Sequence, residues 1–408
     1  MILAEAWQGK RYAVFGLARS GLATVNALVK SACEVACWDD REEARVAANP
    51  FAERVNFLEE GLDGFDALVV SPGVPIHKHP IGAMAREAGC EIIGDVELFA
   101  RARGELPRHA VVGITGTNGK STTTALIDHV LREAGVPSIA AGNIGAPILS
   151  LDPLPQGGVY VLELSSYQID LTQSLGCEVA VLLNITPDHL DRYDGSFEKY
   201  RDSKLRLFAM QDADGVAIDM RETGAPEGEY GEALRGPHNA QNAAAAILAC
   251  SALGLEREAI ARGFQSFKGL PHRMEIVGVR DGVRFVNDSK ATNAESVAPA
   301  LAAFERIRWI VGGEAKADGL EPLLGDLTKV VKAYLVGEAA ERFATQLGDR
   351  VAHVQAETVE EAVRMAAEEA EDGDTVLLSP ACASFDQFRD FEERGEVFRA
   401  AAREAGAC

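Results

Sequence analysis

The stretch GITGTNGKST, residues 113–122, has the residue types of a phosphate-binding loop but not the usual spacing. The common loop reads G-x-x-x-x-G-K-[ST], and counting back from Gly119 finds no glycine at the first position. Lys120 would bring a positive charge to the β- and γ-phosphates, and Ser121 or Thr122 a hydroxyl for Mg²⁺. An apolar run before the loop and a helix-like run after it favour a nucleoside-triphosphate site over a glycine turn with a solvated lysine.

Two strand ends further along the chain carry side chains that could bind a metal. Glu163 ends the apolar run VYVLE, and His189 follows another apolar run in NITPDHLD. A carboxylate and an imidazole at such positions suit a divalent metal, because parallel strands present ligands at their carboxyl ends. Each could also be an ordinary surface residue, and Lys204 in YRDSKLRLF reads as an ordinary helix-face lysine.

Strand, turn and helix patterns repeat along the whole chain and must position these residues. The apolar runs fall into three sets: RYAVFG, CEVACWDD and FDALVVSPG; then HAVVGITG, VYVLELSS and VAVLLNIT; then RIRWIVGG, VKAYLVG and DTVLLSPA. Nearly all-apolar strands that alternate with helices indicate parallel sheets covered on both faces. We therefore predict three α/β domains, at residues 1–95, 96–269 and 270–408.

Charge and cysteine content limit the class of protein. Sixty-two acidic residues against forty basic ones give a formal charge of −22, which repels phosphodiester backbones and argues against nucleic acid as a partner. The seven cysteines are odd in number and never in C-x-x-C spacing, as expected for reduced thiols. No basic start precedes an apolar run, and no segment approaches about 18 uninterrupted apolar residues. We expect a cytoplasmic protein without a membrane partner.

The loop TGTNGKST resembles the ATP loop of the Mur ligase family, whose members build the peptide of bacterial peptidoglycan. That loop keeps one more residue ahead of TGTNGK than the common loop does, which accounts for the spacing. The resemblance covers essentially the whole chain, including GPHNAQNAAAA, GLPHRME, NDSKATN and SPACASFDQF. It implies an N-terminal Rossmann-like domain, a central P-loop ATPase-like domain with a mostly parallel sheet, and a C-terminal Rossmann-like domain.

The resemblance also implies roles for individual residues. By the family pattern two Mg²⁺ ions are bound by Ser121, Glu163, His189 and a carbamate on Lys204. CO₂ forms this carbamate by reacting with the lysine amine. A carbamate is an anion and can hold metal, whereas a lysine ammonium beside two metal ions would be repelled. The implied catalytic residues are Lys120, Glu163, His189, Lys204 and Lys290. The implied ATP contacts are Gly116, Thr117, Asn118, Gly119, Lys120, Ser121, Thr122, Asn239, Asn242, Arg273 and Asp288.

NDSKATN and SPACASFDQF resemble the members of the family that add D-glutamate to UDP-N-acetylmuramoyl-L-alanine. Other members, and the related folylpolyglutamate synthetases, carry a DYAH-like sequence where NDSK stands here. D-Glutamate has two carboxylates and one amine, so its site needs cations and hydroxyls. The implied D-glutamate contacts are Lys290, Thr292, Lys316, Ser384 and Phe391. Lys316 lies in the looser match VGGEAKAD, where a plain loop lysine is the alternative.

The turn FGLARSG, with two aspartates some twenty residues later, approximates a dinucleotide fingerprint, but Ala18 replaces the middle glycine. From the residues alone a helix-packing turn is an equal alternative. In the family this domain holds the UDP end of the substrate. The matching positions are Arg19, Ser20, Asp39, Asp40, Arg41, Ser71, Pro72 and Gly73, and Asn143 in GNIG also contacts substrate. Asp40 stands where a hydroxyl residue is expected.

The activity implied is an ATP-dependent ligase, acting as a monomer, that makes an acyl phosphate and then an amide. A folylpolyglutamate synthetase, or a family member adding another amino acid, is the first alternative. A nicotinamide-dependent oxidoreductase would leave the ATP loop unexplained. A non-catalytic nucleotide-binding protein is expected to lack one of the catalytic groups, whereas Lys120, Glu163, His189 and Lys204 are all present.

Overall fold

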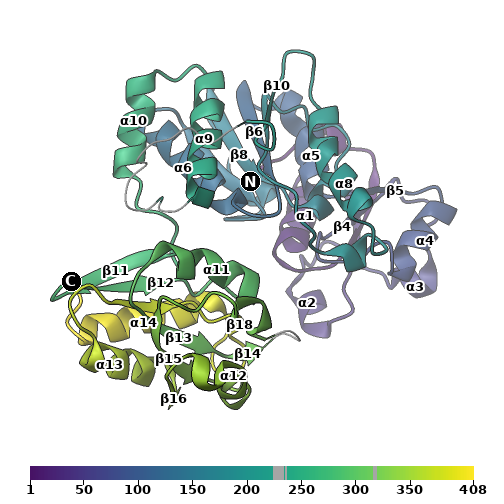
Figure 1. Cartoon of the computed structure of the whole chain (residues 1–408). Helices are drawn as coiled ribbons and strands as arrows, with labels where there is room; N and C mark the ends of the chain where they lie inside the picture. Colours follow the sequence, from purple (N-terminus) through teal and green to yellow (C-terminus); the bar gives the residue numbers. More distant parts are fainter. Residues whose placement is uncertain (224–233, 235–236, 316–318) are drawn as a thin grey trace. The chain divides into compact units, whose positions relative to one another are not determined.

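The computed structural model describes residues 1–223, 234, 237–315 and 319–408, which form two compact units (Figure 1). The first unit holds two five-stranded sheets and ends at Ser266, and the second consists chiefly of residues 267–408. The domain limits near residues 95 and 269 stay predictions. Within the parts of the chain that are described, no helix is long and apolar enough to cross a membrane.

The first sheet is parallel, in the order β3-β2-β1-β4-β5. Its strands are β1 Arg11–Phe15, β2 Glu34–Trp38, β3 Glu53–Arg54, β4 Ala67–Val70 and β5 Glu91–Ile93, with helices α1 Arg19–Lys30, α2 Glu42–Ala47, α3 Phe57–Glu60, α4 Pro80–Glu87 and α5 Asp95–Ala102. Alternate residues of β1 enter different cores: Tyr12 and Val14 one, Ala13 and Phe15 the other. The sheet is therefore covered on both faces, as its all-apolar strands predict.

The second sheet is also parallel, in the order β10-β9-β6-β8-β7. Its strands are β6 His109–Thr115, β7 Ser138–Gly142, β8 Gly158–Glu163, β9 Val179–Leu182 and β10 Val216–Asp219, with helices α6 Lys120–Glu133, α7 Ser166–Asp170, α8 Phe197–Ala209, α9 Pro237–Ala252 and α10 Arg257–Ser266. β6 lies between β8 and β9, so the segments that leave these three strands meet at one edge of the sheet.

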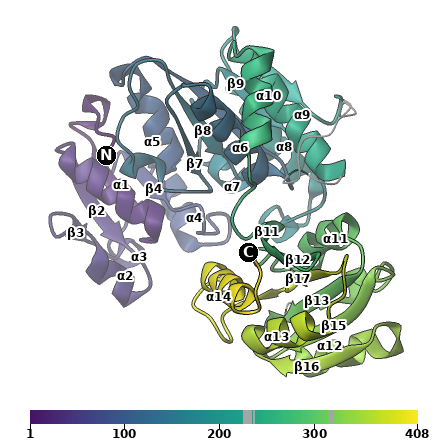
Figure 2. The ribbon, with the colours of Figure 1, turned by 90° about the vertical axis from the view of Figure 1, so that its left-hand side faces the viewer.

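The sheet of the second unit has the order β11-β12-β17-β13-β15-β16. Its strands are β11 Glu275–Arg280, β12 Val283–Asn287, β13 Ile307–Gly312, β15 Val330–Val336, β16 His353–Glu357 and β17 Thr375–Leu378, and a separate short pair joins β14 Glu314–Ala315 to β18 Cys382–Ala383. Helices α11 Ala294–Ala303 and α12 Ala340–Leu347 pack on one face, and α13 Val359–Glu369 and α14 Phe391–Glu404 on the other (Figure 2).

The edge strand β11 departs from the expected parallel arrangement, because it pairs antiparallel with β12. Asp281 and Gly282 connect the two strands and both have positive φ, 50° and 79°. Two residues in that conformation make the hairpin turn that matches strand twist, and Asp-Gly is a preferred sequence for it. The signal was present in VGVRDGVRF, where no hairpin was predicted.

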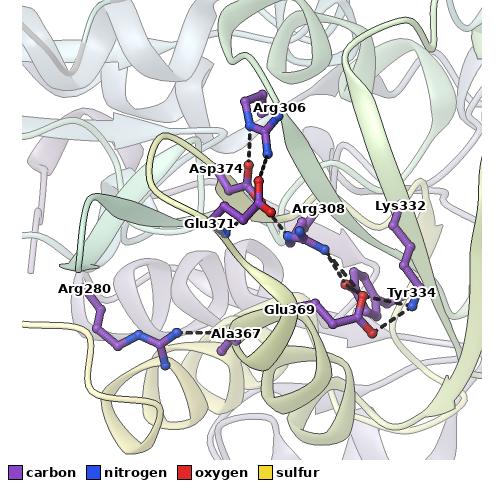
Figure 3. A network of polar contacts seen from close by, with 9 residues as sticks. All are labelled: Arg280, Arg306, Arg308, Lys332, Tyr334, Ala367, Glu369, Glu371 and Asp374. Atoms are coloured by element: carbon purple, nitrogen blue, oxygen red, sulfur yellow. Dashed lines mark hydrogen bonds and ion pairs between the residues drawn. The ribbon is translucent and has the colours of Figure 1, made fainter.

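A buried ion pair lies at the amino end of the parallel strands of the second unit (Figure 3). Asp374, which directly precedes β17, is fully buried and accepts from Arg308 Nε at 2.6 Å and from Arg306 Nε at 2.7 Å. Arg308 also donates to the Tyr334 hydroxyl at 3.2 Å. Burial raises the pKa of Asp374, but the Glu371 N–H and the two guanidinium groups outweigh it and leave the pKa below its ordinary value.

Asp374→Asn is expected to lower the free energy of unfolding of the second unit by about 3 kcal/mol, because it removes the fully buried counterion of Arg308 and leaves that guanidinium only the more exposed Glu369, at 3.4 Å. The decrease in unfolding free energy is measured by urea unfolding, monitored through hydrogen exchange of the β13 and β17 amides. The pair's contribution should be complete above about pH 4 and decline as pH falls through the lowered pKa of the folded state. Glu371→Gln, at an exposed partner of Arg306, is the control and should change nothing measurable. Equal urea midpoints for Asp374→Asn and the native protein would contradict the prediction.

Candidate active site

The loop 116–119 joins the buried end of β6 to the first turn of α6. Gly116 and Gly119 have φ values of 152° and 86°, which a side chain disfavours. A Cβ on Gly119 would collide with the side-chain oxygen of Asn242 on α9. The loop therefore brings its N–H groups to the N-terminus of a 14-residue helix, which is an anion-binding arrangement. Of the two hydroxyl residues predicted to bind Mg²⁺ or the phosphates, Ser121 is buried and Thr122 is half-buried.

Protein groups that follow β9 hold this loop in shape. The Asn118 N–H donates to Asn184 Oδ1 at 2.9 Å, and Asn184 Nδ2 donates back to the Asn118 carbonyl at 3.1 Å. The Thr117 hydroxyl accepts from the Thr186 N–H at 3.0 Å and lies 3.0 Å from the Tyr200 hydroxyl. Asn184 was not among the predicted site residues, although its place directly after the buried run VAVLL was a usable signal.

Two lysines from different helices meet at one carbonyl of the loop. Lys120 Nζ donates to Gly116 O at 2.9 Å and to Thr117 O at 2.8 Å, and Lys204 Nζ donates to the same Gly116 O at 2.8 Å. Lys204 is only 2% exposed, although its position on α8 predicted a surface lysine. Burial, and next the positive charge of Lys120, lower the pKa of Lys204 to about 7. Much of this amine is therefore uncharged near neutral pH.

Glu163 ends β8 and presents one carboxylate oxygen without a protein partner. The side chain is 2% exposed, and Oε1 accepts from Asn143 Nδ2 at 2.8 Å. Asn143 is fixed in turn, because its N–H donates to the Glu163 carbonyl at 2.9 Å. Oε2 has no hydrogen-bond partner in the described part of the chain. A buried carboxylate oxygen left in this way is costly unless a cation or donor meets it, so the site fits a divalent metal.

His189 lies in a left-handed turn, with φ 52°, and about half of its side chain is exposed. Its Nε2 is 3.4 Å from Asp188 Oδ2, and its ring lies 5.3 Å from the Tyr167 ring. Among the described residues no three His, Cys, Asp or Glu side chains form a metal cluster. The structure thus brings the two lysines together at the loop. His189 instead lies in an exposed turn, where its neighbours are Asp188 and Tyr167.

Arg192, three residues after His189, links that turn to the predicted UDP-binding turn 71–73. Its guanidinium donates to the carbonyls of Gly73 at 2.5 Å, Val74 at 3.1 Å and Pro72 at 3.4 Å. It also lies 4.2 Å from the centre of the Tyr167 ring. Arg192 was missed by sequence reasoning, because one arginine in a polar loop carries no signal of what it contacts.

The N-terminal turn 16–21 has the features of a closely packed strand-to-helix turn. A Cβ on Gly21 would collide with the Gly16 carbonyl, which also accepts from the Ser71 hydroxyl at 2.6 Å. The Ser20 hydroxyl lies 3.4 Å from that of Ser71. Arg19 donates to the Gly145 carbonyl at 2.8 Å. The turn therefore gathers three of the residues predicted to contact the UDP substrate.

Of the two aspartates that follow β2, Asp39 turns back toward the protein. Its Oδ2 accepts from the Leu17 N–H at 2.6 Å, and its Oδ1 accepts from the N–H and Nε of Arg41. Burial raises the pKa of Asp39, but these hydrogen bonds outweigh it and leave the pKa below its ordinary value. Asp40 is exposed and lies 3.7 Å from His79 Nε2. The Asp39 carboxylate thus stabilises the turn after β1 and the segment after β2.

The second unit gathers most of the residues predicted to bind D-glutamate. Lys290 Nζ lies 3.9 Å from the centre of the Phe391 ring, and the Thr292 N–H donates to the Lys290 carbonyl at 2.9 Å. Ser384, directly after β18, is buried. Lys316 lies outside the described residues. Lys290 and Phe391 therefore form one predicted cluster, with Thr292 adjoining it.

The residues predicted to surround the nucleotide lie on separate segments. Asp288 is buried, and its carboxylate accepts from the Ser379 hydroxyl at 2.7 Å and from the Met274 N–H at 3.1 Å. Burial raises the pKa of Asp288 to about 7. Arg273 directly precedes Met274. The two asparagines predicted for this role, Asn239 and Asn242, are both buried on α9.

Comparison with known proteins shows the family to which the chain belongs. Residues 10–94 match the model of a Mur ligase MurD-like N-terminal domain, residues 114–225 that of a Mur ligase middle domain, and residues 272–382 that of a Mur ligase glutamate ligase domain. The UDP-N-acetylmuramoylalanine–D-glutamate ligase of Sphingopyxis alaskensis is 56% identical over 435 residues, covering 100% of both chains. The chain belongs to the Mur ligase family.

Solved structures of two ligases from Thermotoga maritima have a fold similar to that of this Mur ligase. The UDP-N-acetylmuramate–alanine ligase of Thermotoga maritima is 17% identical with a TM-score of 0.59, covering 97% of this chain and 100% of that one. The MurF ligase of the same organism, solved in complex with ADP, is 17% identical with a TM-score of 0.58, covering 98% of each. The predicted fold class is confirmed.

Proposed function

We propose that this Mur ligase uses ATP and Mg²⁺ to join D-glutamate to UDP-N-acetylmuramoyl-L-alanine, in the cytoplasm and as a step of peptidoglycan precursor synthesis. The observation that carries the proposal is the 56% identity, over the full length of both chains, with a protein named for that reaction. The phosphate loop with its two lysines and the acceptor cluster around Lys290 supply chemistry that the reaction needs.

In the first step the alanyl carboxylate attacks the γ-phosphorus of ATP, and the bond to the β-phosphate oxygen breaks to give an acyl phosphate and ADP. The N–H groups at the N-terminus of α6 and the Lys120 ammonium would hold the triphosphate and offset its negative charge. Ser121, Glu163, His189 and the carbamate of Lys204 would hold Mg²⁺, which when bound supplies further neutralisation of the transferring phosphoryl group. Asn143 holds Glu163 Oε1, so the other oxygen of that carboxylate would be the one available to a metal.

In the second step the amine of D-glutamate attacks the activated carbonyl, and the tetrahedral intermediate expels phosphate to leave the amide. Lys290 and the hydroxyls of Thr292 and Ser384 would bind the carboxylates of the amino acid, and Phe391 would pack against its methylene groups. Asp288 and Arg273 would lie near the nucleotide. Because water destroys an acyl phosphate, the amine must be bound before the intermediate meets solvent.

The test is phosphate release from ATP with Mg²⁺ and UDP-N-acetylmuramoyl-L-alanine, with D-glutamate, L-glutamate, L-lysine or meso-diaminopimelate as the amine. Release that requires both the nucleotide sugar and D-glutamate is expected. Release with another amine, or only with a folate, would move the substrate assignment within this fold. If no amine gives phosphate release together with the nucleotide sugar, and no folate does so either, the proposal is wrong.

Carbamylation of Lys204 is expected to be visible directly. In buffer containing ¹³C-bicarbonate, a carbamate signal should appear in the ¹³C NMR spectrum and grow as pH rises through about 7, because only the uncharged amine reacts with CO₂. Lys204→Arg should lose the signal. Lys199→Arg is the matched control on the same helix, since Lys199 is exposed and paired with Asp194. An equal signal in Lys204→Arg would refute the assignment.

A further inference from the structure

Arg394 is a buried cation whose hydrogen-bond partners are all uncharged oxygens. The residue is 1% exposed and lies in the first turn of α14. Its Nε donates to Ser289 Oγ at 3.0 Å, and Nη2 donates to Ser289 O at 2.9 Å and to Cys382 O at 3.1 Å. Nη1 donates to Ala383 O at 3.2 Å. The fork of the guanidinium therefore binds two separate segments of the second unit.

The charge of Arg394 is not neutralised by these contacts. The buried Arg308 of the same unit is paired with Asp374, whereas Arg394 forms no ion pair with the described residues, and the Asp386 carboxylate acts on it only at longer range. Burial lowers the pKa of Arg394 to about 10, so the group still carries its charge at neutral pH. An unpaired buried cation is costly to a fold, and an anion bound nearby would offset that cost.

The segments that Arg394 holds carry residues proposed to bind the acceptor. Ser289 directly precedes Lys290, and Ala383 directly precedes Ser384. The Ser289 hydroxyl also donates to the carbonyl of Phe391 at 2.8 Å, and the Phe391 ring lies beneath Lys290. One guanidinium thus links three of the proposed acceptor-binding positions through their sequence neighbours.

We infer that Arg394 is a positioning residue that selects a dicarboxylate amine as the acceptor. Its hydrogen bonds hold the Lys290 and Ser384 segments in one arrangement, and its unpaired charge attracts the carboxylates that those segments bind. The inference rests on the proposed function and deepens it. Arg394 would thus contribute to the preference for a doubly charged acceptor without contacting the acceptor itself.

The experiment compares Arg394→Met and Arg394→Lys with Arg399→Met. Arg399 lies on the same helix, but it is paired with Glu275 at 2.8 Å and with Glu396, so its charge is already neutralised. Steady-state phosphate release is measured with D-glutamate, ATP and UDP-N-acetylmuramoyl-L-alanine varied in turn. Hydroxylamine trapping of the acyl phosphate, without D-glutamate, reports the first step alone.

Arg394→Met is expected to raise the KM for D-glutamate roughly tenfold, since the loss of a unit charge that attracts the carboxylates through protein contributes on that order. Arg394→Lys keeps the charge and should raise it less. The KM values for ATP and the nucleotide sugar, and the rate of hydroxylamine trapping, should stay at the native level, and Arg399→Met should match the native enzyme throughout.

An unchanged KM for D-glutamate in folded Arg394→Met would overturn the inference, and so would equal rises in all three KM values. If Arg394→Met does not fold, Arg394→Lys decides: a raised KM for D-glutamate with native trapping supports the inference, and a native KM refutes it. Failure of the proposed function is a different result, because the native enzyme would then give no trapped product with the nucleotide sugar.

Discussion

Lys120→Met is expected to lower kcat for phosphate release by about 10³-fold while the protein stays folded. Lys120 is the first residue of α6, and its Nζ lies 2.9 Å from the Gly116 carbonyl of the loop that is proposed to bind the phosphates. Methionine keeps the length of the side chain but removes the charge that would offset the β- and γ-phosphate oxygens. Steady-state kinetics at saturating ATP, with a circular dichroism spectrum of the variant, measures the effect.

Lys199→Met is the control for Lys120→Met, because Lys199 is an exposed lysine of the same unit, and near-native kinetics are expected of it. A second readout follows from the neighbouring lysine. Since the positive charge of Lys120 helps to lower the pKa of Lys204, its removal should raise that pKa and reduce the carbamate signal at neutral pH. A Lys120→Met enzyme with more than a tenth of native kcat would show that the loop does not use this charge.

Glu163→Gln is expected to reduce kcat by about 10²-fold or more and to raise the Mg²⁺ concentration needed for half-maximal rate. The amide keeps the shape of the side chain and can still accept from Asn143, but it replaces an anionic ligand with a neutral one. The free energy of unfolding should stay level or rise, because the variant removes a buried carboxylate oxygen that has no protein partner.

The matched control for Glu163→Gln is Glu133→Gln, at the exposed end of α6, for which native Mg²⁺ dependence is expected. Titration of Mg²⁺ against initial rate, with urea unfolding of the same samples, separates a metal effect from a folding effect. A Glu163→Gln enzyme with the native Mg²⁺ midpoint would remove Glu163 from the proposed metal site.

The strand-end positions of Glu163 and the phosphate loop could be predicted because local patterns indicate the strands, whereas the order of the strands in the sheet was not predicted. All-apolar runs predicted β6, β8 and β9, and parallel pairing then brings the segments after them to one sheet edge. The apolar runs and their parallel pairing therefore account for the closeness of Glu163 and the phosphate loop. Family resemblance, and not pattern, supplied the roles of Lys204 and of the acceptor residues.

The contacts of long polar side chains could not be predicted in this way. Lys204 lies in YRDSKLRLF, where four of nine residues are charged, so the sequence indicates a solvent-exposed lysine. Its side chain is nevertheless buried and donates to Gly116 O. Arg394 lies in an equally polar run and is also buried. In both, most partners are backbone carbonyls distant in sequence, and every residue has a carbonyl, so the residue pattern cannot show which one is bound.

The bonds between the phosphate loop and the residues after β9 also bear on the thermodynamics of nucleotide binding. Because Asn184 and Thr186 hold Asn118 and Thr117, the loop loses its conformational entropy when the chain folds. A nucleotide that arrives later meets a preorganised loop and does not bear that ordering cost. Loosening the loop at Asn184 would therefore make the entropy of nucleotide binding less favourable, even though Asn184 need not touch the nucleotide.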